Sequence, residues 1–268
     1  MKNLILLIVL NAIIIVSCGE NAKTADTSCI SPDNEIKCDT FKLHEEHFLN
    51  SNDKDSPYIS FDFEIPYAKT GNKEFDNRIN KAIAKTVCGN DNIHTIEGAH
   101  KELIKKEYES YCNYTNSIME YYNESSRVRY IHFLESFGFM ETGHNGYINY
   151  SIINNFYEGG AHPCHEETHF NIDPTNGNII TLDDIFKGDY RKGLIPYIKD
   201  AVAKYFDYNT FEEALESTNV FDTIFVPNNF LLKEDCVVFI FNELEIARRP
   251  CGSVEAEIPY EKIKHLLR

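Results

Sequence analysis

Strict alternation of polar and apolar residues between positions 58 and 65 is the feature that most constrains the fold of this chain. One face of the stretch would carry Tyr58, Ser60, Asp62 and Glu64, and the other would carry Ile59, Phe61, Phe63 and Ile65. Because successive side chains of a β-strand point to opposite faces, the pattern predicts a half-buried strand, which Pro66 is expected to end. The next apolar residues recur every four positions and predict an amphipathic helix closed by Gly89; they are Phe75, Ile79, Ile83 and Val87.

The rest of the chain mixes the same two periods. A second helix is expected near 99–114, and alternating runs at 127–140 and 147–157 predict strands joined by a turn at Asn145-Gly146. Further along we expect a strand ending at Ile172, helices over 181–186, 194–205 and 260–267, and strands near 222–226, 235–242 and 253–258. Interleaved helices and hairpin signals predict an α+β fold with mainly antiparallel sheets and packed helices. We expect two small mixed domains, residues 56–150 and 151–268, each long enough to bury a core.

The first residues have the pattern of a bacterial export signal. An apolar run from Leu4 to Val16 follows Lys2, and Ile15-Val16-Ser17-Cys18 resembles the lipobox of bacterial lipoproteins. We therefore expect residues 1–17 to be a lipoprotein signal peptide, Cys18 to carry a diacylglycerol and a further acyl chain such as palmitate, and residues 18–55 to be a polar tether. The alternative is an ordinary signal peptide or signal anchor. The expected location is the bacterial cell envelope, on the periplasmic side or the cell surface.

The net charge of the chain limits the classes of partner that it can be expected to bind. The formal net charge is −16, and loss of Lys2 with the signal would make the mature chain more negative by one. Such an acidic chain is not expected to bind nucleic acid or anionic phospholipid headgroups, and it would attract cationic partners at long range.

Seven cysteines follow Cys18, and an exported protein meets an oxidising environment. We predict the disulfides Cys29–Cys38, Cys88–Cys112 and Cys164–Cys251, although the sequence leaves their connectivity open. Cys236 lies in an apolar run and is our candidate for the unpaired thiol.

The segment His165-Glu166-Glu167-Thr168-His169 spells the zinc-protease motif His-Glu-x-x-His. Two His residues four apart meet on a helix, but they lie about 13 Å apart along a strand. Gly159-Gly160 and Pro163 before the segment, and Asp173-Pro174 after it, favour a strand. We therefore expect no metal, no cofactor and no catalytic residue here. The alternative is a zinc-dependent hydrolase that uses His165, Glu166 and His169; an adventitious metal on the strand face, with His162, Cys164 and Glu167 nearby, also stays open.

The other common catalytic patterns are missing from the sequence. It contains no Gly-x-Ser-x-Gly elbow, no phosphate-binding loop and no dinucleotide fingerprint. We therefore expect a protein that is not an enzyme.

The second half resembles a known domain. The segments Tyr157–His162 and Ile180–Phe186, in that order, look like the domain of unknown function in the extracellular part of the lysozyme-sensing anti-sigma factor. The same domain occurs in some envelope lipoproteins and beside some peptidoglycan deacetylases. The closing stretch Val254–Leu267 is similar to the end of that domain, and Phe63–Pro66 leading into a helix is similar to its companion domain. The resemblance covers most of residues 56–268 and implies a non-catalytic domain that faces the cell wall or lysozyme.

That resemblance also points to a binding edge. Where the family commonly has an Ala-Pro-Tyr-Ala-Ala-Gly type of loop, this chain has Ala247-Arg-Arg-Pro-Cys-Gly252. The loops at 158–165 and 247–252 are the candidate edge, although the two arginines could instead pair with Glu243 or Glu245. The expected ligand is a lysozyme, a peptidoglycan fragment or another envelope protein; a structural lipoprotein that acts by assembly is a further alternative. The candidate ligand-binding residues are Gly159, Gly160, His162, Arg248, Arg249 and Pro250.

Overall fold

The computed structural model describes residues 36–90, 92–118, 130–217 and 219–268. The predicted signal peptide, Cys18 and Cys29 lie outside these residues. Within them the fold is α+β, as predicted, with two sheets whose strands are mostly antiparallel. No helix among the described residues is both long enough and apolar enough to cross a membrane.

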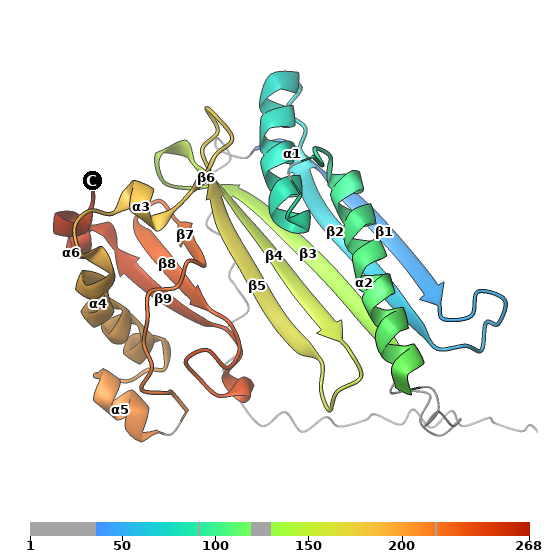
Figure 1. The fold of residues 1–268 in the computed structure, drawn as a ribbon. Helices are drawn as coiled ribbons and strands as arrows, with labels where there is room; N and C mark the ends of the chain where they lie inside the picture. The colour runs from blue at the N-terminus through green and yellow to red at the C-terminus, as the bar shows by residue number, and fades with distance from the viewer. Residues whose placement is uncertain (1–35, 91, 119–129, 218) are drawn as a thin grey trace, which may run out of the picture. The chain divides into compact units, whose positions relative to one another are not determined.

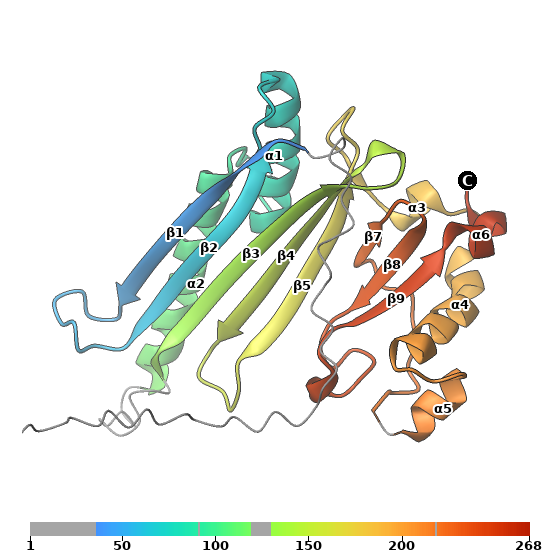
Figure 2. The same ribbon diagram turned by 180° about the vertical axis from the view of Figure 1, so that it is seen from behind.

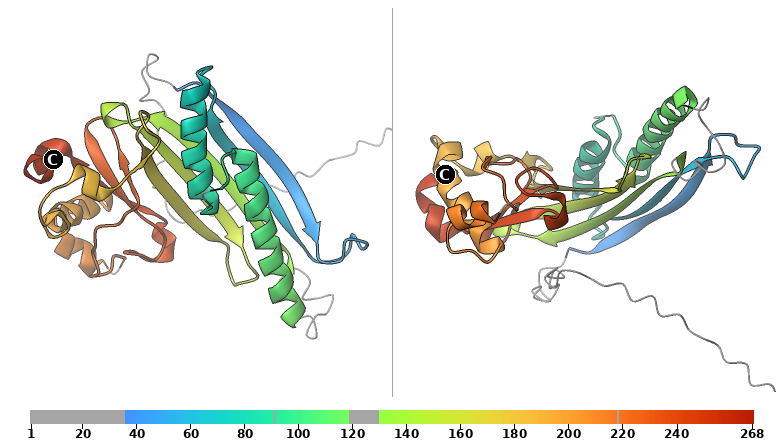
Figure 3. Two further views of the ribbon diagram at one scale, coloured as in Figure 1. Left: turned by 45° about the horizontal axis from the view of Figure 1, so that its top comes forward. Right: turned by 90° about the horizontal axis from the view of Figure 1, so that it is seen from below.

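A six-stranded sheet with the order β1-β2-β3-β4-β5-β6 contains most of the first half of the chain (Figure 1). Only β2 and β3 are parallel, because the helices α1 and α2 lie between them in the chain. Both helices lie on the same face of the sheet, as Figure 3 shows from below, whereas no described helix covers the face seen in Figure 2. The elements of this layer are β1 (Cys38–Phe48), β2 (Tyr58–Ala68), α1 (Lys73–Cys88), α2 (Ile96–Ile118), β3 (His132–Thr142), β4 (Ile148–Tyr157), β5 (Cys164–Ile172) and β6 (Ile179–Ile180).

The predicted periodicity builds the core of this layer. The odd-numbered apolar residues of β2 are buried against α1 and α2, as expected from the alternation. Asn72 caps α1 by accepting hydrogen bonds from the backbone of Glu74 and Phe75, and Gly89 ends the helix with φ +64°. Pro66 does not end β2, which was predicted to stop there. The strand continues to Ala68, and the Pro66 carbonyl accepts a hydrogen bond from the buried Tyr150 hydroxyl.

A second sheet, β7-β8-β9, packs against the helices of the C-terminal part. Helix α4 lies along it, with Leu194, Ile198 and Val202 fully buried. The strand predicted near 222–226 does not form, and the strand that pairs with β8 begins later, at Phe230. The elements of this layer are α3 (Leu182–Ile185), α4 (Tyr190–Tyr205), α5 (Phe211–Glu216), β7 (Phe230–Leu232), β8 (Cys236–Phe241), β9 (Val254–Pro259) and α6 (Tyr260–Ile263), with short 3-10 turns at η3 (His144–Gly146), η4 (Arg249–Cys251) and η5 (Lys264–Leu266).

Two of the predicted boundaries need correction. Residues 38–48 of the predicted tether form β1, which pairs with β2 along its whole length. The division between residues 150 and 151 falls inside β4, and the sheet continues through β5 and β6. Hydrogen bonds between strands therefore cross the predicted domain boundary, and the described residues from 36 to 268 belong to one compact unit.

Buried amides join the two sheets. Asn171, fully buried in β5, donates to the Phe230 carbonyl at 2.9 Å and accepts from the Leu232 amide at 2.9 Å. Asn149 in β4 donates to the Leu232 carbonyl at 3.0 Å. Gly143 lies at the same point, where a β-carbon would clash with the Leu232 carbonyl oxygen and the Asn149 amide. These contacts satisfy backbone groups of β7 that β8 does not reach.

The predicted disulfides are wrong within the described residues. Cys38, Cys88, Cys112, Cys164, Cys236 and Cys251 all have free thiols. The Cys88 thiol donates instead to the Ala84 carbonyl of its own helix at 3.0 Å. The order of cysteines along a chain does not show which sulfur atoms come within about 2 Å of each other, the distance that a disulfide requires.

Candidate functional site

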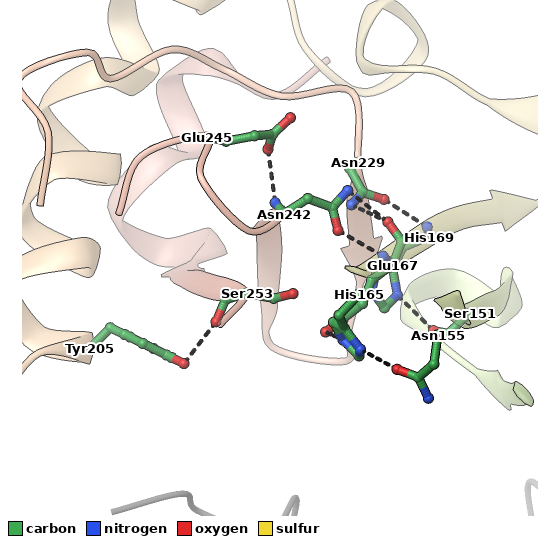
Figure 4. A network of polar contacts seen from close by, with 10 residues as sticks. All are labelled: Ser151, Asn155, His165, Glu167, His169, Tyr205, Asn229, Asn242, Glu245 and Ser253. Atoms are coloured by element: carbon green, nitrogen blue, oxygen red, sulfur yellow. Dashed lines mark hydrogen bonds and ion pairs between the residues drawn. The ribbon is translucent and has the colours of Figure 1, made fainter. Parts of the chain in front are cut away.

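The His-Glu-x-x-His segment lies in β5, which confirms the predicted strand (Figure 4). Residues 165, 167 and 169 face one side of the sheet, and residues 166 and 168 face the other, where α1 and α2 lie. The hydrolase alternative required a helix at this position, and the segment is not helical. No group of three or more potential metal ligands comes together among the described residues.

Glu167 sits between the two histidines. Its carboxylate accepts from Nε2 of His165 at 3.0 Å and from Nε2 of His169 at 2.9 Å. Burial alone would raise the pKa of the Glu167 carboxyl, but the hydrogen bonds from His169 and His165 outweigh burial and hold this pKa at about 2. The other ring nitrogens contact Asn155 and Ser151, at 2.8 and 2.7 Å. All five side chains therefore position one another, and Glu167 is charged at neutral pH.

Two asparagine side chains replace a neighbouring strand along this part of β5. The Asn229 amide accepts from the His169 backbone N–H at 2.6 Å and donates to the Glu167 carbonyl at 2.9 Å. The Asn242 amide accepts from the Glu167 backbone N–H at 2.7 Å and donates to the same carbonyl at 3.0 Å. Exposed strand edges are otherwise ready to pair with other chains. The cluster around Glu167 therefore closes an edge and holds the C-terminal layer to β5.

The two loops of the predicted binding edge do meet. Arg249 donates to the Pro163 carbonyl at 3.0 Å and lies 3.3 Å from the Glu243 carboxylate, so one of the two suggested ion pairs forms. Gly159, Gly160 and His162 lie in the turn between β4 and β5; Arg248, just before η4, and Pro250, within it, are exposed. This places all six candidate residues on one edge of the molecule.

A groove of about 420 Å³ lies on the other face of the sheet, between α2 and strands β3, β4 and β5. We call it the α2 groove. Aromatic rings form much of its wall: Tyr111 and Tyr114 from α2, Phe133 from β3, and Phe156 and Tyr157 from β4. Hydrogen-bonding groups form much of the remainder; they are Glu107, Ser110, Ser136, Asn154, Glu158, Glu166 and Thr168. Apolar walls with a few converging polar groups are the usual make-up of a ligand site.

His132 is the most unusual residue of the α2 groove. It is only 4% exposed, and its Nε2 has no hydrogen-bond partner among the described residues. The rings of Tyr111, Tyr114 and Tyr157 surround it, with centroids 4.9, 5.8 and 6.4 Å away. Burial lowers the pKa of His132 to about 4, so the ring is neutral at pH 7. A buried polar atom without a partner costs about 1–3 kcal/mol, and a ligand group can recover part of this.

The charge of the groove has one sign. Glu107, Glu158 and Glu166 line it, and none of the described residues that line it is Lys or Arg. Burial also lowers the pKa of His100, the second histidine in the lining. The described lining therefore has acidic side chains without basic ones and disfavours anionic ligands.

The α2 groove is the feature that sequence analysis missed. Tyr111 falls within the helix predicted near 99–114, and the alternation of β3 and β4 gives no reason to separate His132 or Asn154 from other strand residues. A pattern of aromatic residues can identify the face of an element that packs against others. It cannot show where no helix or strand packs on that face, which is where a groove forms.

Comparison with known proteins agrees with the fold. Residues 183–261 match the family described as "Protein of unknown function (DUF3298)". The second half therefore contains a domain of unknown function over residues 183–261. A crystal structure of a DUF3298 family member from Bacteroides fragilis NCTC 9343 is similar with a TM-score of 0.73 and 25% identity, over 88% of this chain and 94% of that one.

A DUF3298 family protein from Pseudomonas aeruginosa PAO1 is also similar, with a TM-score of 0.54 and 12% identity, over 87% of this chain and 95% of that chain. At that identity the likeness concerns the fold alone. A comparison with curated proteins gave no match.

Proposed function

We propose that this protein is a non-catalytic binding protein of the bacterial cell envelope, anchored by a lipid on Cys18, and that it takes an extracytoplasmic ligand in the α2 groove. The observation that carries the proposal is the groove itself, whose volume of about 420 Å³ is within the range of ligand sites. It is lined by stacking surfaces and hydrogen-bonding groups. The turn at 158–165 begins with Glu158, which lines the groove, so the predicted binding edge adjoins it.

Charge favours a basic protein of the lysozyme kind over a peptidoglycan fragment. The formal net charge of −16 speeds the approach of a cationic partner, and the groove adds local negative charge. Peptidoglycan fragments with stem peptides carry carboxylates, which Glu107, Glu158 and Glu166 would repel. Arg248 would oppose a basic partner locally, whereas Arg249 is already engaged by Glu243 and the Pro163 carbonyl.

The absence of catalysis is part of the proposal. His165 and His169 are engaged with Glu167 on a strand, in a geometry that supports a structural role. We expect the purified protein to hold no stoichiometric zinc. Mass spectrometry of the native protein measures this directly, and about one zinc per chain that is lost in His165→Ala would revive the hydrolase alternative.

The test of the proposed function is a titration of the purified protein with a basic lysozyme, with the same lysozyme acetylated on its lysines, and with muropeptides. We expect saturable binding of the unmodified lysozyme that weakens as salt rises, and much weaker binding of the acetylated form. Binding of muropeptides alone would make the protein a peptidoglycan receptor. Binding of neither ligand would reject both named partners.

A further inference from the structure

The α2 groove combines three features that together specify a ligand. It has aromatic faces, it has carboxylates but no basic residue in its described lining, and it has a buried nitrogen that no described residue contacts by a hydrogen bond. Each feature alone has an ordinary explanation, since exposed carboxylates are usually solvated and a buried nitrogen can hold a water molecule. Their convergence within one groove narrows the chemistry of what can bind there.

A cation satisfies all three features. Aromatic faces attract a guanidinium or ammonium group, and the attraction grows when the group leaves bulk water. Carboxylates add charge-assisted hydrogen bonds, which are about twice as strong as neutral ones. The neutral His132 ring can accept an N–H from the same group. A neutral sugar would use the rings and hydroxyl groups but would gain nothing from the excess negative charge.

We propose that the α2 groove is a cation-binding site that holds a guanidinium or ammonium group between Tyr114 and Tyr157, with Glu107 and Glu158 as counter-ions and Nε2 of His132 as an acceptor. Tyr114 is 46% exposed and lies beside His132, so a change of its rotamer opens the way to this nitrogen. The inference rests on the proposed function and adds the chemical group that the groove recognises. A basic side chain of a protein is the favoured source; a free amine or a de-acetylated amino sugar carries the same chemistry.

The first experiment uses two small probes of the same shape. N-acetyl-arginine amide carries the guanidinium group, and N-acetyl-citrulline amide carries a neutral urea in its place. Binding is followed by isotope-edited NMR of the Tyr and His rings, with the full chain as the protein. We expect saturable shifts at Tyr114, Tyr157 and His132 with the arginine probe, and at least tenfold weaker binding of the citrulline probe.

Matched variants locate the site. Glu107→Gln with Glu158→Gln removes both proposed counter-ions, and Glu102→Gln with Glu109→Gln removes two exposed charges of α2 that do not line the groove. The first pair should weaken the arginine probe about tenfold or more, whereas the second pair should change it less than twofold. Equal weakening by both pairs would indicate a general field effect and would overturn the site.

Lysozyme binding by the same variants separates the two proposals. If the arginine probe binds and lysozyme binding falls with Glu107→Gln/Glu158→Gln, the source of the cation is a basic protein. If the probe binds but lysozyme does not, the cation site stands and the named partner fails. Lysozyme binding that survives in these variants, with no shift caused by the arginine probe, would overturn the cation site and leave the proposed function intact. Failure of both ligands would overturn both.

Discussion

The Glu167 carboxylate accepts a hydrogen bond from Nε2 of His169, two residues further along the same strand, at 2.9 Å. His165 makes the equivalent contact from the other side at 3.0 Å. The two histidines that suggested a zinc site therefore face a carboxylate that lies between them. Their spacing on a strand leaves room for that carboxylate, whereas a helix would have brought the two rings together.

The Glu167 cluster should be a major source of stability. We expect Glu167→Gln to lower the free energy of unfolding by on the order of 2–3 kcal/mol at pH 7, because it leaves two partly buried imidazoles facing a neutral amide. Urea unfolding measures the loss. Glu166→Gln, on the opposite face of the same strand and exposed, is the matched control and should change stability by less than about 0.5 kcal/mol.

The low pKa of Glu167 predicts that the stability of the protein depends on pH. The pKa of the Glu167 carboxyl is about 2 in the folded protein, whereas its ordinary value is 4.5. Its depressed pKa contributes stability that is present above about pH 4.5 and is lost as pH falls towards 2. The stability difference between the wild-type protein and Glu167→Gln should therefore shrink over this range. A difference that stayed constant down to pH 2 would contradict the assignment.

We expect His132 to lower the free energy of unfolding and to contribute to binding of the arginine probe. Replacing it by Phe removes a buried nitrogen without a partner, so we expect the unfolding free energy to rise by about 1 kcal/mol at pH 7 and arginine-probe binding to fall. As pH falls from 6.5 to about 4, the wild-type protein should lose stability. In this range His132 is protonated in the unfolded chain, whereas burial keeps it neutral in the folded protein. The variant should lack this component of the loss. Lower stability of the variant at pH 7 would show that His132 makes a contact worth more than its desolvation.

Gly143 should tolerate no side chain. A β-carbon there would meet the Leu232 carbonyl and the Asn149 amide at the junction of the two sheets, so Gly143→Ala should lower stability by about 1–3 kcal/mol. Gly160→Ala is the control, since its β-carbon would meet only the His162 carbonyl oxygen, at an ordinary contact distance of 3.9 Å, and its φ is not positive. Thermal unfolding of the two variants compares them, and equal melting temperatures would show that the junction can shift without cost.

The lipid anchor is tested at Cys18. We expect the wild-type protein to appear in the membrane fraction and to incorporate labelled palmitate, and Cys18→Ser to do neither. The Cys29→Ser variant serves as control for loss of a nearby thiol. Incorporation of label into Cys18→Ser would contradict the lipobox interpretation and would favour an ordinary signal peptide or signal anchor.

Local pattern was enough for many of the elements and for the strand conformation of the His-Glu-x-x-His segment, although it missed β1 and predicted a strand near 222–226 that does not form. Period-two and period-four spacing identified β2 and α1, and glycine and proline around residues 159–174 identified β5, because burial of one face imposes a period that the chain carries in its own sequence. The Pro66 stop failed because the ladder between β2 and β3 ends at Glu64, so Pro66 lies where one side of β2 has no partner strand and proline is tolerated, while pairing with β1 continues to Ala68.

Tertiary structure decided the rest. Three features depend on which distant segments meet. Asn229 and Asn242 close the edge of β5, no two described cysteines form a disulfide, and strands β3 to β5 leave a groove beside α2. The sequence by itself determined the periods, the turns and the acidic charge, since these are properties of neighbouring residues. The sites were decided by tertiary structure alone, because a hydrogen bond, a disulfide or a cavity is a relation between residues whose separation in space no local pattern encodes.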